Sequence, residues 1–141
     1  MTKFLNEERL LKALDDMFYE SKKFMYLVSP YIKLDDWLKN NFEDCQADSL
    51  IIVYGKKFME FNSYDFLREF ADIELYFHKD LHAKVYINER RALISSMNLY
   101  DYSMDNNIEC GVQITADDPA YKYALDFVQG VIEDSKPIQK R

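Results

Sequence analysis

Glycine, proline, cysteine and histidine are all scarce in this chain of 141 residues, with 3, 3, 2 and 2 copies respectively. The scarcity of glycine and proline excludes collagen-like chains and linker-rich chains. The two cysteines, Cys45 and Cys110, lie far apart and form no C-x-x-C pair, and two histidines are too few to complete a zinc cluster with them. We expect both cysteines to be small core residues in a reduced, cytoplasmic setting, with a disulfide between them as the alternative.

Long apolar runs are missing as well. No run approaches the roughly 18 residues that a membrane helix needs. The first nine residues, Met1 to Arg9, contain no apolar stretch of the kind found in a secretion signal. The sequence therefore predicts a cytoplasmic protein without a membrane segment.

The overall composition is typical of a globular protein with more acidic than basic residues. Hydrophobic residues make up 48% and charged residues 30%, which fits one domain over 1–134 followed by a polar tail at 135–141. Aromatic residues reach 16%, enough for a dense core, a sticky surface or both. The charges sum to 18 − 25 = −7, which argues against a protein that coats DNA through bulk charge but leaves room for a small basic pocket.

The first half of the chain alternates helical and strand-like patterns. Apolar residues at helical spacing begin at Leu5, with Asn6 as a cap, and Asp35 and Ser63 open two further helices. Three continuous apolar runs between the helices have the length of buried strands: 24–28, 49–54 and 73–77. This αβαβαβ order predicts a mixed, mostly parallel sheet with helices on both faces, which is an α/β fold.

In the second half of the chain, helical and strand-like patterns no longer alternate. Two strand-like runs, 83–87 and 92–96, flank the polar turn 88–91 and predict a hairpin. A further strand is expected over 107–115. Pro119 marks the start of a last helix, with Tyr123, Phe127 and Val131 on one face.

Polar side chains that can handle a phosphate group gather on the predicted hairpin. Because side chains alternate along a strand, His82 and Lys84 project to the same side, and Tyr86 follows them there. The hairpin would bring Ser96 and Asn98 beside them. Imidazole can attack phosphorus or pass a proton, while ammonium and amide groups hold the charged phosphate oxygens. Glu109, on the next strand, could orient an imidazole.

These residues resemble a known family. His82-Ala83-Lys84, then Ser95-Ser96-Met97-Asn98, then Glu109 in the run 107–112 is similar to the H-x-K…S-x-N…E signature of the phospholipase D superfamily. Ser29-Pro30-Tyr31, after the first buried strand, is also similar to that family. The resemblance implies a phospholipase D-like half-domain of the small endonuclease branch.

The resemblance also implies roles for these residues. His82 would attack phosphorus and form a phosphohistidine, Lys84 and Asn98 would bind the phosphate oxygens, and Glu109 would hold the histidine ring. Ser96, with Ser95 beside it, would support them at the substrate. Independently of the resemblance, Tyr100 lies in a loop just after the site strand, which makes it a candidate to contact substrate. Because the family needs two histidines and this chain has one motif, the resemblance implies a homodimer that builds the site across its two-fold axis. It implies no metal and no cofactor.

The signature departs from the family pattern at two places. The acidic residue five positions after Lys84 is Glu89 in place of aspartate, with Asn88 as the alternative equivalent if the turn is one residue shorter. Ser95 replaces the usual glycine. The sequence thus favours a metal-independent phosphodiesterase that acts on nucleic acid. Two alternatives stay open: a phospholipid phosphodiesterase or transferase, and a non-catalytic module that binds phosphate or nucleic acid.

Overall fold

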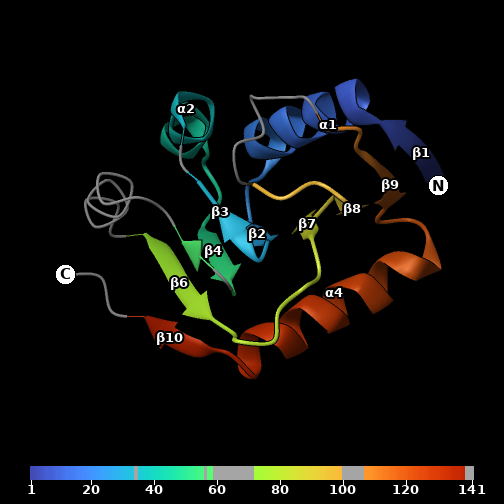
Figure 1. Cartoon of the computed structure of the whole chain (residues 1–141). Coiled ribbons are helices and arrows are strands. Elements are labelled where there is room, and N and C mark those ends of the chain that lie inside the picture. Colours follow the sequence, from blue (N-terminus) through green and yellow to red (C-terminus); the bar gives the residue numbers. More distant parts are fainter. Residues whose placement is uncertain (34, 56, 59–71, 100–106, 139–141) are drawn as a thin grey trace.

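A computed structural model describes residues 1–33, 35–55, 57–58, 72–99 and 107–138 of the chain (Figure 1). The described helices are Glu7–Glu20 (α1), Asp36–Asp44 (α2) and Pro119–Glu133 (α4). The described strands are Thr2–Asn6 (β1), Phe24–Val28 (β2), Tyr31–Ile32 (β3), Ser49–Tyr54 (β4), Lys57–Phe58 (β5), Ile73–Phe77 (β6), Val85–Asn88 (β7), Arg91–Ser95 (β8), Cys110–Thr115 (β9) and Lys136–Ile138 (β10). The helix expected after Ser63 falls outside the described residues.

One mixed sheet organises these elements, in the order β1-β9-β8-β7-β2-β4-β6-β10. Strands β2, β4 and β6 pair in parallel, as their continuous apolar runs predicted. The expectation that the sheet is mostly parallel is wrong, because all the other pairings within it are antiparallel. The reason is that the β7–β8 hairpin, β9 and the two terminal strands extend the parallel centre on both sides.

Helices cover both faces of the sheet, as expected. Helices α1 and α2 lie on one face and α4 lies on the other (Figure 1). Side chains of the hairpin strand β7 alternate between these two layers: Tyr86 packs beneath α1, while Val85 and Ile87 pack beneath α4. The sequence expectation for these three side chains is confirmed, and the core is therefore two layers separated by the sheet.

The helix caps follow the sequence prediction. The Asn6 Oδ1 atom accepts the Arg9 backbone N–H at 3.0 Å, and the Asp35 Oδ1 atom accepts that of Leu38 at 3.0 Å. Each cap satisfies a backbone donor that the first turn of a helix leaves without a partner. Helix α4 begins at Pro119, as predicted, with Asp118 as its cap.

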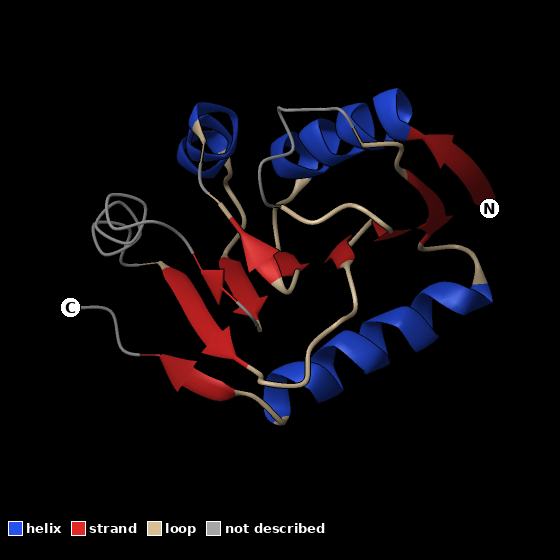
Figure 2. Cartoon of the chain, in the orientation of Figure 1, coloured by secondary structure: helices blue, strands red, loops and turns tan. Residues whose placement is uncertain are grey.

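Both ends of the chain form edge strands that the sequence did not predict (Figure 2). Strand β1 pairs with β9, so strand structure precedes the helix that was expected from Leu5. Strand β10 pairs with β6, so Lys136–Ile138 of the expected polar tail is ordered in the sheet. These short runs lack a hydrophobic alternation of their own, and only the exposed edges of the sheet give them partners.

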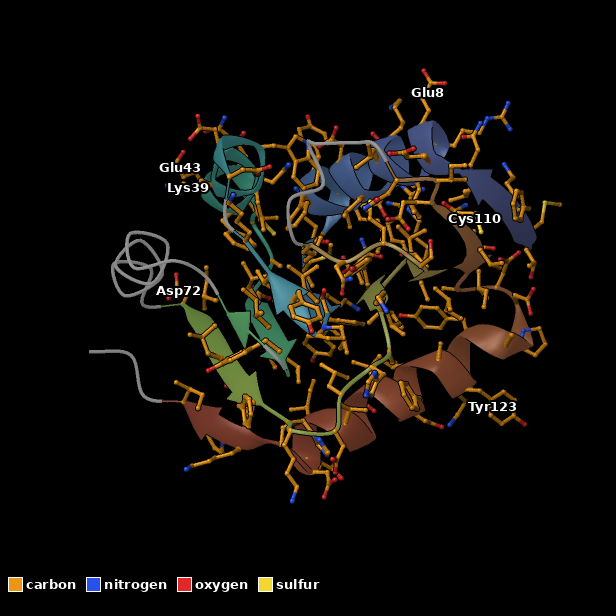
Figure 3. All side chains as sticks on the ribbon, viewed as in Figure 1. Glu8, Lys39, Glu43, Asp72, Cys110 and Tyr123 are labelled. Carbon is orange, nitrogen blue, oxygen red and sulfur yellow. The ribbon has the colours of Figure 1, made fainter. Side chains whose placement is uncertain are left out.

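Two further expectations are wrong. On α4, Tyr121 and Val128 are buried, whereas Tyr123 is 77% exposed and points away from the sheet (Figure 3). Helix α4 is apolar on more than one side, so helical spacing alone did not select its buried stripe. Of the cysteines, Cys110 is exposed at the start of β9 and Cys45 is half-buried, and both are free thiols.

The turn between β7 and β8 is held by side chains at the end of the sheet where β2 begins. The Glu89 carboxylate accepts backbone N–H groups of Lys22, Lys23 and Phe24 at 2.8, 3.2 and 3.2 Å. Burial by itself raises the pKa of Glu89, but these hydrogen bonds outweigh it and lower the pKa below its ordinary value. The Asn88 Oδ1 atom accepts the N–H groups of Arg90 and Arg91, both at 2.9 Å. Both candidates for the family's acidic position therefore support this turn.

Glu89→Gln is expected to lower the free energy of unfolding at pH 7 by about 1 kcal/mol, because a neutral amide is a weaker acceptor for three N–H groups. The pKa of Glu89 is lower in the folded than in the unfolded chain, so its stabilisation exists above the unfolded pKa near 4.5 and is lost as the pH falls through the folded value. Urea unfolding at several pH values measures this difference. Glu133→Gln, on the exposed end of α4, is the matched control. An effect of Glu89→Gln that grows toward pH 3 contradicts the assignment.

Candidate functional site

The candidate site lies at the edge of the sheet where the parallel strands end. Ser29 follows β2, Gly55 follows β4, and the segment 78–84 leads from β6 into β7 at this same edge. A Cβ atom added to Gly55 would lie 2.7 Å from the Leu81 Cβ and 2.8 Å from the His78 carbonyl oxygen. The backbone before His82 thus packs directly on Gly55, and this contact positions the segment that carries the histidine.

His82 and Lys84 lie just before β7 and not on the strand, which corrects the predicted strand bounds. The Lys84 carbonyl nevertheless accepts the Ser95 N–H at 3.1 Å, so the hairpin pairing continues to this point. The Lys84 Nζ donates to the His82 carbonyl at 3.2 Å, which holds the ammonium beside the histidine. The His82 side chain is exposed, and its ring makes no hydrogen bond to any residue that the structure describes.

The segment after β8 is fastened to the core by two hydroxyl groups. The buried Tyr86 hydroxyl donates to the Met97 carbonyl at 2.5 Å. The Ser95 Oγ accepts the Met97 N–H at 2.8 Å. Both contacts fix the residue that directly precedes Asn98, so Tyr86 and Ser95 are positioning residues for the Asn98 amide.

Ser29 reaches the same segment from β2. Its Oγ accepts the Leu99 N–H at 3.1 Å, donates to the Tyr31 carbonyl at 2.7 Å and lies 3.4 Å from the Asn98 Oδ1. Ser29 is fully buried, so these contacts satisfy a polar group that would otherwise be costly to bury. Ser29 and Asn98 are therefore neighbours, a contact that the sequence analysis did not predict.

Ser96 and Glu109 also meet at this edge. The Ser96 Oγ lies 2.5 Å from the Glu109 Oε1 and 3.1 Å from the Cys110 backbone nitrogen, whose N–H it accepts. Glu109 stands immediately before β9 and not on it. The role of Glu109 in holding the His82 ring stays a prediction, because the contact that the structure describes for this carboxylate is with Ser96.

The electrostatics of the buried tyrosine connect these groups. Burial raises the pKa of Tyr86 well above its ordinary value, the hydrogen bond with Ser29 opposes the rise, and the negative charge of Glu109 adds to it. The hydroxyl therefore stays protonated at every physiological pH and remains a donor to Met97.

The structure brings together most of the predicted site residues, at one edge of the sheet: His82, Lys84, Ser95, Ser96, Asn98 and Glu109. Tyr100 lies outside the described residues. The sequence analysis missed the anchoring roles of Ser29 and Tyr86, although the strand alternation had placed Tyr86 on the His82 side. A small polar residue directly after a buried strand, such as Ser29, was the other available signal.

His78 lies beside the site but is held by structural contacts. Its Nδ1 accepts the Asp80 N–H at 3.1 Å, and its Nε2 lies 2.8 Å from the Asp134 Oδ2 at the end of α4. Because Nδ1 accepts a hydrogen bond, the hydrogen of the neutral imidazole is on Nε2. His78, His82 and Phe127 contribute to the lining of one hollow of about 250 Å³.

For the phosphodiesterase activity that the sequence resemblance implies, Tyr86→Phe is expected to lower kcat by about tenfold, because the Met97 carbonyl keeps only the 3.2 Å contact with the Ser95 Oγ and Asn98 is held less firmly. The free energy of unfolding falls by about 1 kcal/mol. Tyr121→Phe is a matched control: the Tyr121 hydroxyl donates to the Asn88 carbonyl at 2.5 Å at the opposite end of β7. The control should lose similar stability and keep its kcat. Equal kcat values in the two variants would contradict a positioning role for Tyr86.

Within the described ranges, no group of three or more histidine, cysteine, aspartate or glutamate side chains is placed to hold a metal ion. Among the described helices, none is long and apolar enough to cross a membrane.

Comparison with solved structures identifies the fold. NucT from Helicobacter pylori superposes with a TM-score of 0.78 and 14% identity, over 98% of this chain and 99% of that one. Nuc from Salmonella typhimurium, a phospholipase D family member, superposes with a TM-score of 0.75 and 14% identity, over 99% and 98%. The archaeal chromatin protein TrmBL2 superposes with a TM-score of 0.67 and 13% identity, over 97% of this chain and 53% of that one.

No protein-family model and no curated protein sequence matches the chain. The structural similarity covers nearly the full length of this chain, of Nuc and of NucT. The resemblance that the motif spacing indicated is thus confirmed at the level of the fold: this chain has the phospholipase D fold, as Nuc has it.

Proposed function

We propose that this chain is a phosphodiesterase that cleaves nucleic-acid strands through a phosphohistidine at His82, in a site that two copies of the chain build together. The observation that carries the proposal is the position of His82, Lys84 and Asn98 at one edge of a phospholipase D fold. The His82 ring is exposed and unbonded among the described residues, which suits a nucleophile. The structural similarity to Nuc, which covers nearly the whole of both chains, supports phosphodiester cleavage as the reaction.

The proposed reaction has two displacement steps. In the first, a ring nitrogen of His82 bonds to phosphorus, the bond from phosphorus to the leaving oxygen breaks, and that oxygen takes a proton from the His82 imidazolium of the second copy. In the second, water bonds to phosphorus and gives its proton to the same second ring, and the phosphorus–nitrogen bond breaks. Lys84 and Asn98 hold the non-bridging oxygens in both steps.

The second copy is required because this chain supplies one motif and each step uses two imidazoles. Exposed apolar side chains beside the site support such an association. Ile94, on the strand that leads into the site segment, is 43% exposed, and Phe127 is 50% exposed in the hollow that His82 also lines. Apolar side chains near a polar site are typical of surfaces that a partner covers.

A hydrolysis assay with bis(4-nitrophenyl) phosphate in EDTA tests the chemistry. Because no step uses a metal, we expect turnover in EDTA, and a requirement for added Mg²⁺ would contradict the mechanism. One ring is neutral while the other is protonated, so the rate should be bell-shaped between about pH 5 and 8. Light scattering on the same sample should give the mass of a dimer. A monomer that is active at all concentrations would exclude the shared site.

A non-catalytic DNA-binding role is the second candidate. The similarity to TrmBL2, an archaeal chromatin protein whose structure shows a mode of DNA binding, favours it. The hydrogen bond of Glu109 with Ser96 also favours it, because this carboxylate is then engaged away from the His82 ring. A protein that binds oligonucleotides but hydrolyses neither them nor the nitrophenyl diester would support this candidate over the enzyme.

A further inference from the structure

The sheet face on which α4 lies is uncovered at one corner. Helix α4 crosses this face obliquely, from the end of β9 toward β10 (Figure 1). On β8, Ala92 is completely buried in the layer beneath α4, whereas Ile94, two residues nearer the candidate site on the same face, is 43% exposed. On the edge strand β1, Phe4 is 68% exposed. The cover that α4 provides therefore ends before these positions, and large apolar side chains remain in contact with solvent.

The strand register places these side chains in one row. Phe4 is opposite Val112, and Val112 is opposite Ile94. All three side chains point to the α4 side, because Val112 packs in the layer beneath α4 and the neighbours Leu5 and Leu93 pack beneath α1. Opposite residues of antiparallel strands are roughly 5 Å apart, so the row is a continuous apolar strip across three strands.

This corner contains no charged residue. On the α4 side, the described strands β1, β9 and β8 present only uncharged residues: Thr2, Phe4, Asn6, Cys110, Val112, Ile114, Ala92 and Ile94. The α1 side of the same strands carries Lys3 and Arg91, and 30% of all residues in the chain are charged. Depletion of charge around exposed apolar side chains is typical of the core of a protein–protein interface. We call the exposed part of this face the uncharged corner: Phe4, Asn6, Ile94, Cys110 and Val112.

The uncharged corner adjoins the candidate site. Ile94 is opposite Val85, the residue that follows Lys84. At the end of the corner, the Cys110 carbonyl accepts the Ser96 N–H at 3.0 Å, and Cys110 directly follows Glu109. Cys110 lies on β9 near the outer edge of the sheet (Figure 3). A molecule that covers the corner would therefore border the segments that carry the site residues.

The missing charge indicates which molecule covers the corner. In a two-fold dimer the same surface of both copies lies in the interface, so every charge on it is buried twice, and like charges can meet. An uncharged apolar surface avoids this cost. A nucleic-acid strand would need cations on the surface that binds it, and so would an anionic membrane. A second copy of this chain is the partner that fits, and the candidate site requires one.

We propose that a second copy of this chain docks on the uncharged corner and buries Phe4, Val112 and Ile94. This inference rests on the proposed function, which requires two copies at one site. It adds the surface through which they meet, because docking at this corner brings the partner beside the segments that hold Lys84 and Ser96. The outer side of α1 and the opposite edge strand β10 remain outside the contact.

Phe4→Glu and Ile94→Glu test the proposal, because each places a carboxylate that dimerisation would have to take out of water in both copies. Sedimentation velocity on full-length protein, from about 0.1 to 100 µM, measures the Kd of the dimer. Each substitution should raise this Kd at least about 100-fold. Phe4→Ala, a neutral change at an exposed position, should raise it about tenfold. Circular dichroism on each variant confirms that the fold is retained.

Tyr19→Glu is the matched control, because it exchanges an aromatic ring that is 83% exposed for a carboxylate on α1, on the other face of the sheet. The control should leave the Kd of the dimer unchanged. Equal Kd values for the Phe4→Glu, Ile94→Glu and Tyr19→Glu proteins would overturn the proposal. So would wild-type protein that stays monomeric over the whole concentration range, or a monomer that floats with phosphatidylcholine vesicles.

Hydrolysis of the nitrophenyl diester separates this proposal from the proposed function. If both hold, turnover per chain in the Phe4→Glu protein falls with dissociation and recovers at protein concentrations above its Kd. A dimer that Phe4→Glu and Ile94→Glu dissociate, in a protein without hydrolytic activity, supports the corner and rejects the enzyme. Hydrolysis by a dimer whose Kd is indifferent to both substitutions supports the enzyme and rejects the corner.

Discussion

His82→Asn is expected to lower kcat for phosphodiester hydrolysis by at least about 10⁴-fold, because the amide cannot form the covalent bond to phosphorus. Asparagine keeps a polar side chain of smaller size at an exposed position, and the ring it replaces makes no hydrogen bond to the described residues. The free energy of unfolding should therefore change by less than about 0.5 kcal/mol. Loss of activity without loss of stability is the signature of a reacting group.

Initial rates with bis(4-nitrophenyl) phosphate, beside urea unfolding of the same samples, measure both effects. His78→Asn is the matched control, because it makes the same chemical change in the other histidine, whose ring is held by Asp80 and Asp134. It should lose some stability and keep most of its activity. If His82→Asn retained more than about a hundredth of the wild-type rate, a nucleophilic role for His82 would be excluded.

Arg91→Met is expected to lower the free energy of unfolding by about 2 to 3 kcal/mol, the largest stability effect at a site away from the hydrophobic core. The guanidinium donates to both Glu20 oxygens, at 2.9 Å from Nε and 2.6 Å from Nη2, and to the Gln113 Oε1 at 2.9 Å. Both side chains of the ion pair are only 18% exposed. Methionine would leave the Glu20 carboxylate nearly buried with Asn88 Nδ2, at 3.0 Å, as its remaining side-chain partner.

Thermal unfolding should show a decrease in Tm of roughly 6 to 10 °C for a chain of this size. Arg90→Met, the adjacent exposed arginine, should change the stability by less than about 0.5 kcal/mol. The double variant Arg91→Met with Glu20→Gln should lose less free energy of unfolding than the two single variants lose in sum, because it leaves no buried charge unpaired. An Arg91→Met protein as stable as the Arg90→Met protein would contradict the importance of this ion pair.

The central strands could be predicted from the sequence because their signals are local. Strands β2, β4 and β6 have the predicted bounds, since each is a continuous apolar run. Pro30 and Gly55 mark the ends of the first two. The edge strands β1 and β10 could not be predicted, because they owe their structure to partners more than fifty residues away. Sequence spacing likewise predicted the start of α4 but not its buried side, which the sheet selects.

Part of the candidate site could likewise be predicted from the sequence, and part could not. The spacing of His82, Lys84, Ser96 and Asn98 was sufficient to place them together, because a hairpin brings its two strand ends to one edge. The contacts behind them could not be predicted. Ser29 is 69 residues from Asn98, and the choice of Ser96 as the partner of Glu109 depends on how β9 pairs with β8.

Gly55 packs against the segment that leads to His82, so a substitution at position 55 would move the histidine without touching it. The backbone that leads to His82 rests where a side chain at position 55 would be, so even a methyl group there would meet a carbonyl oxygen that cannot rotate away. A larger residue at this position would therefore displace the segment that carries His82 without changing any side chain of the candidate site.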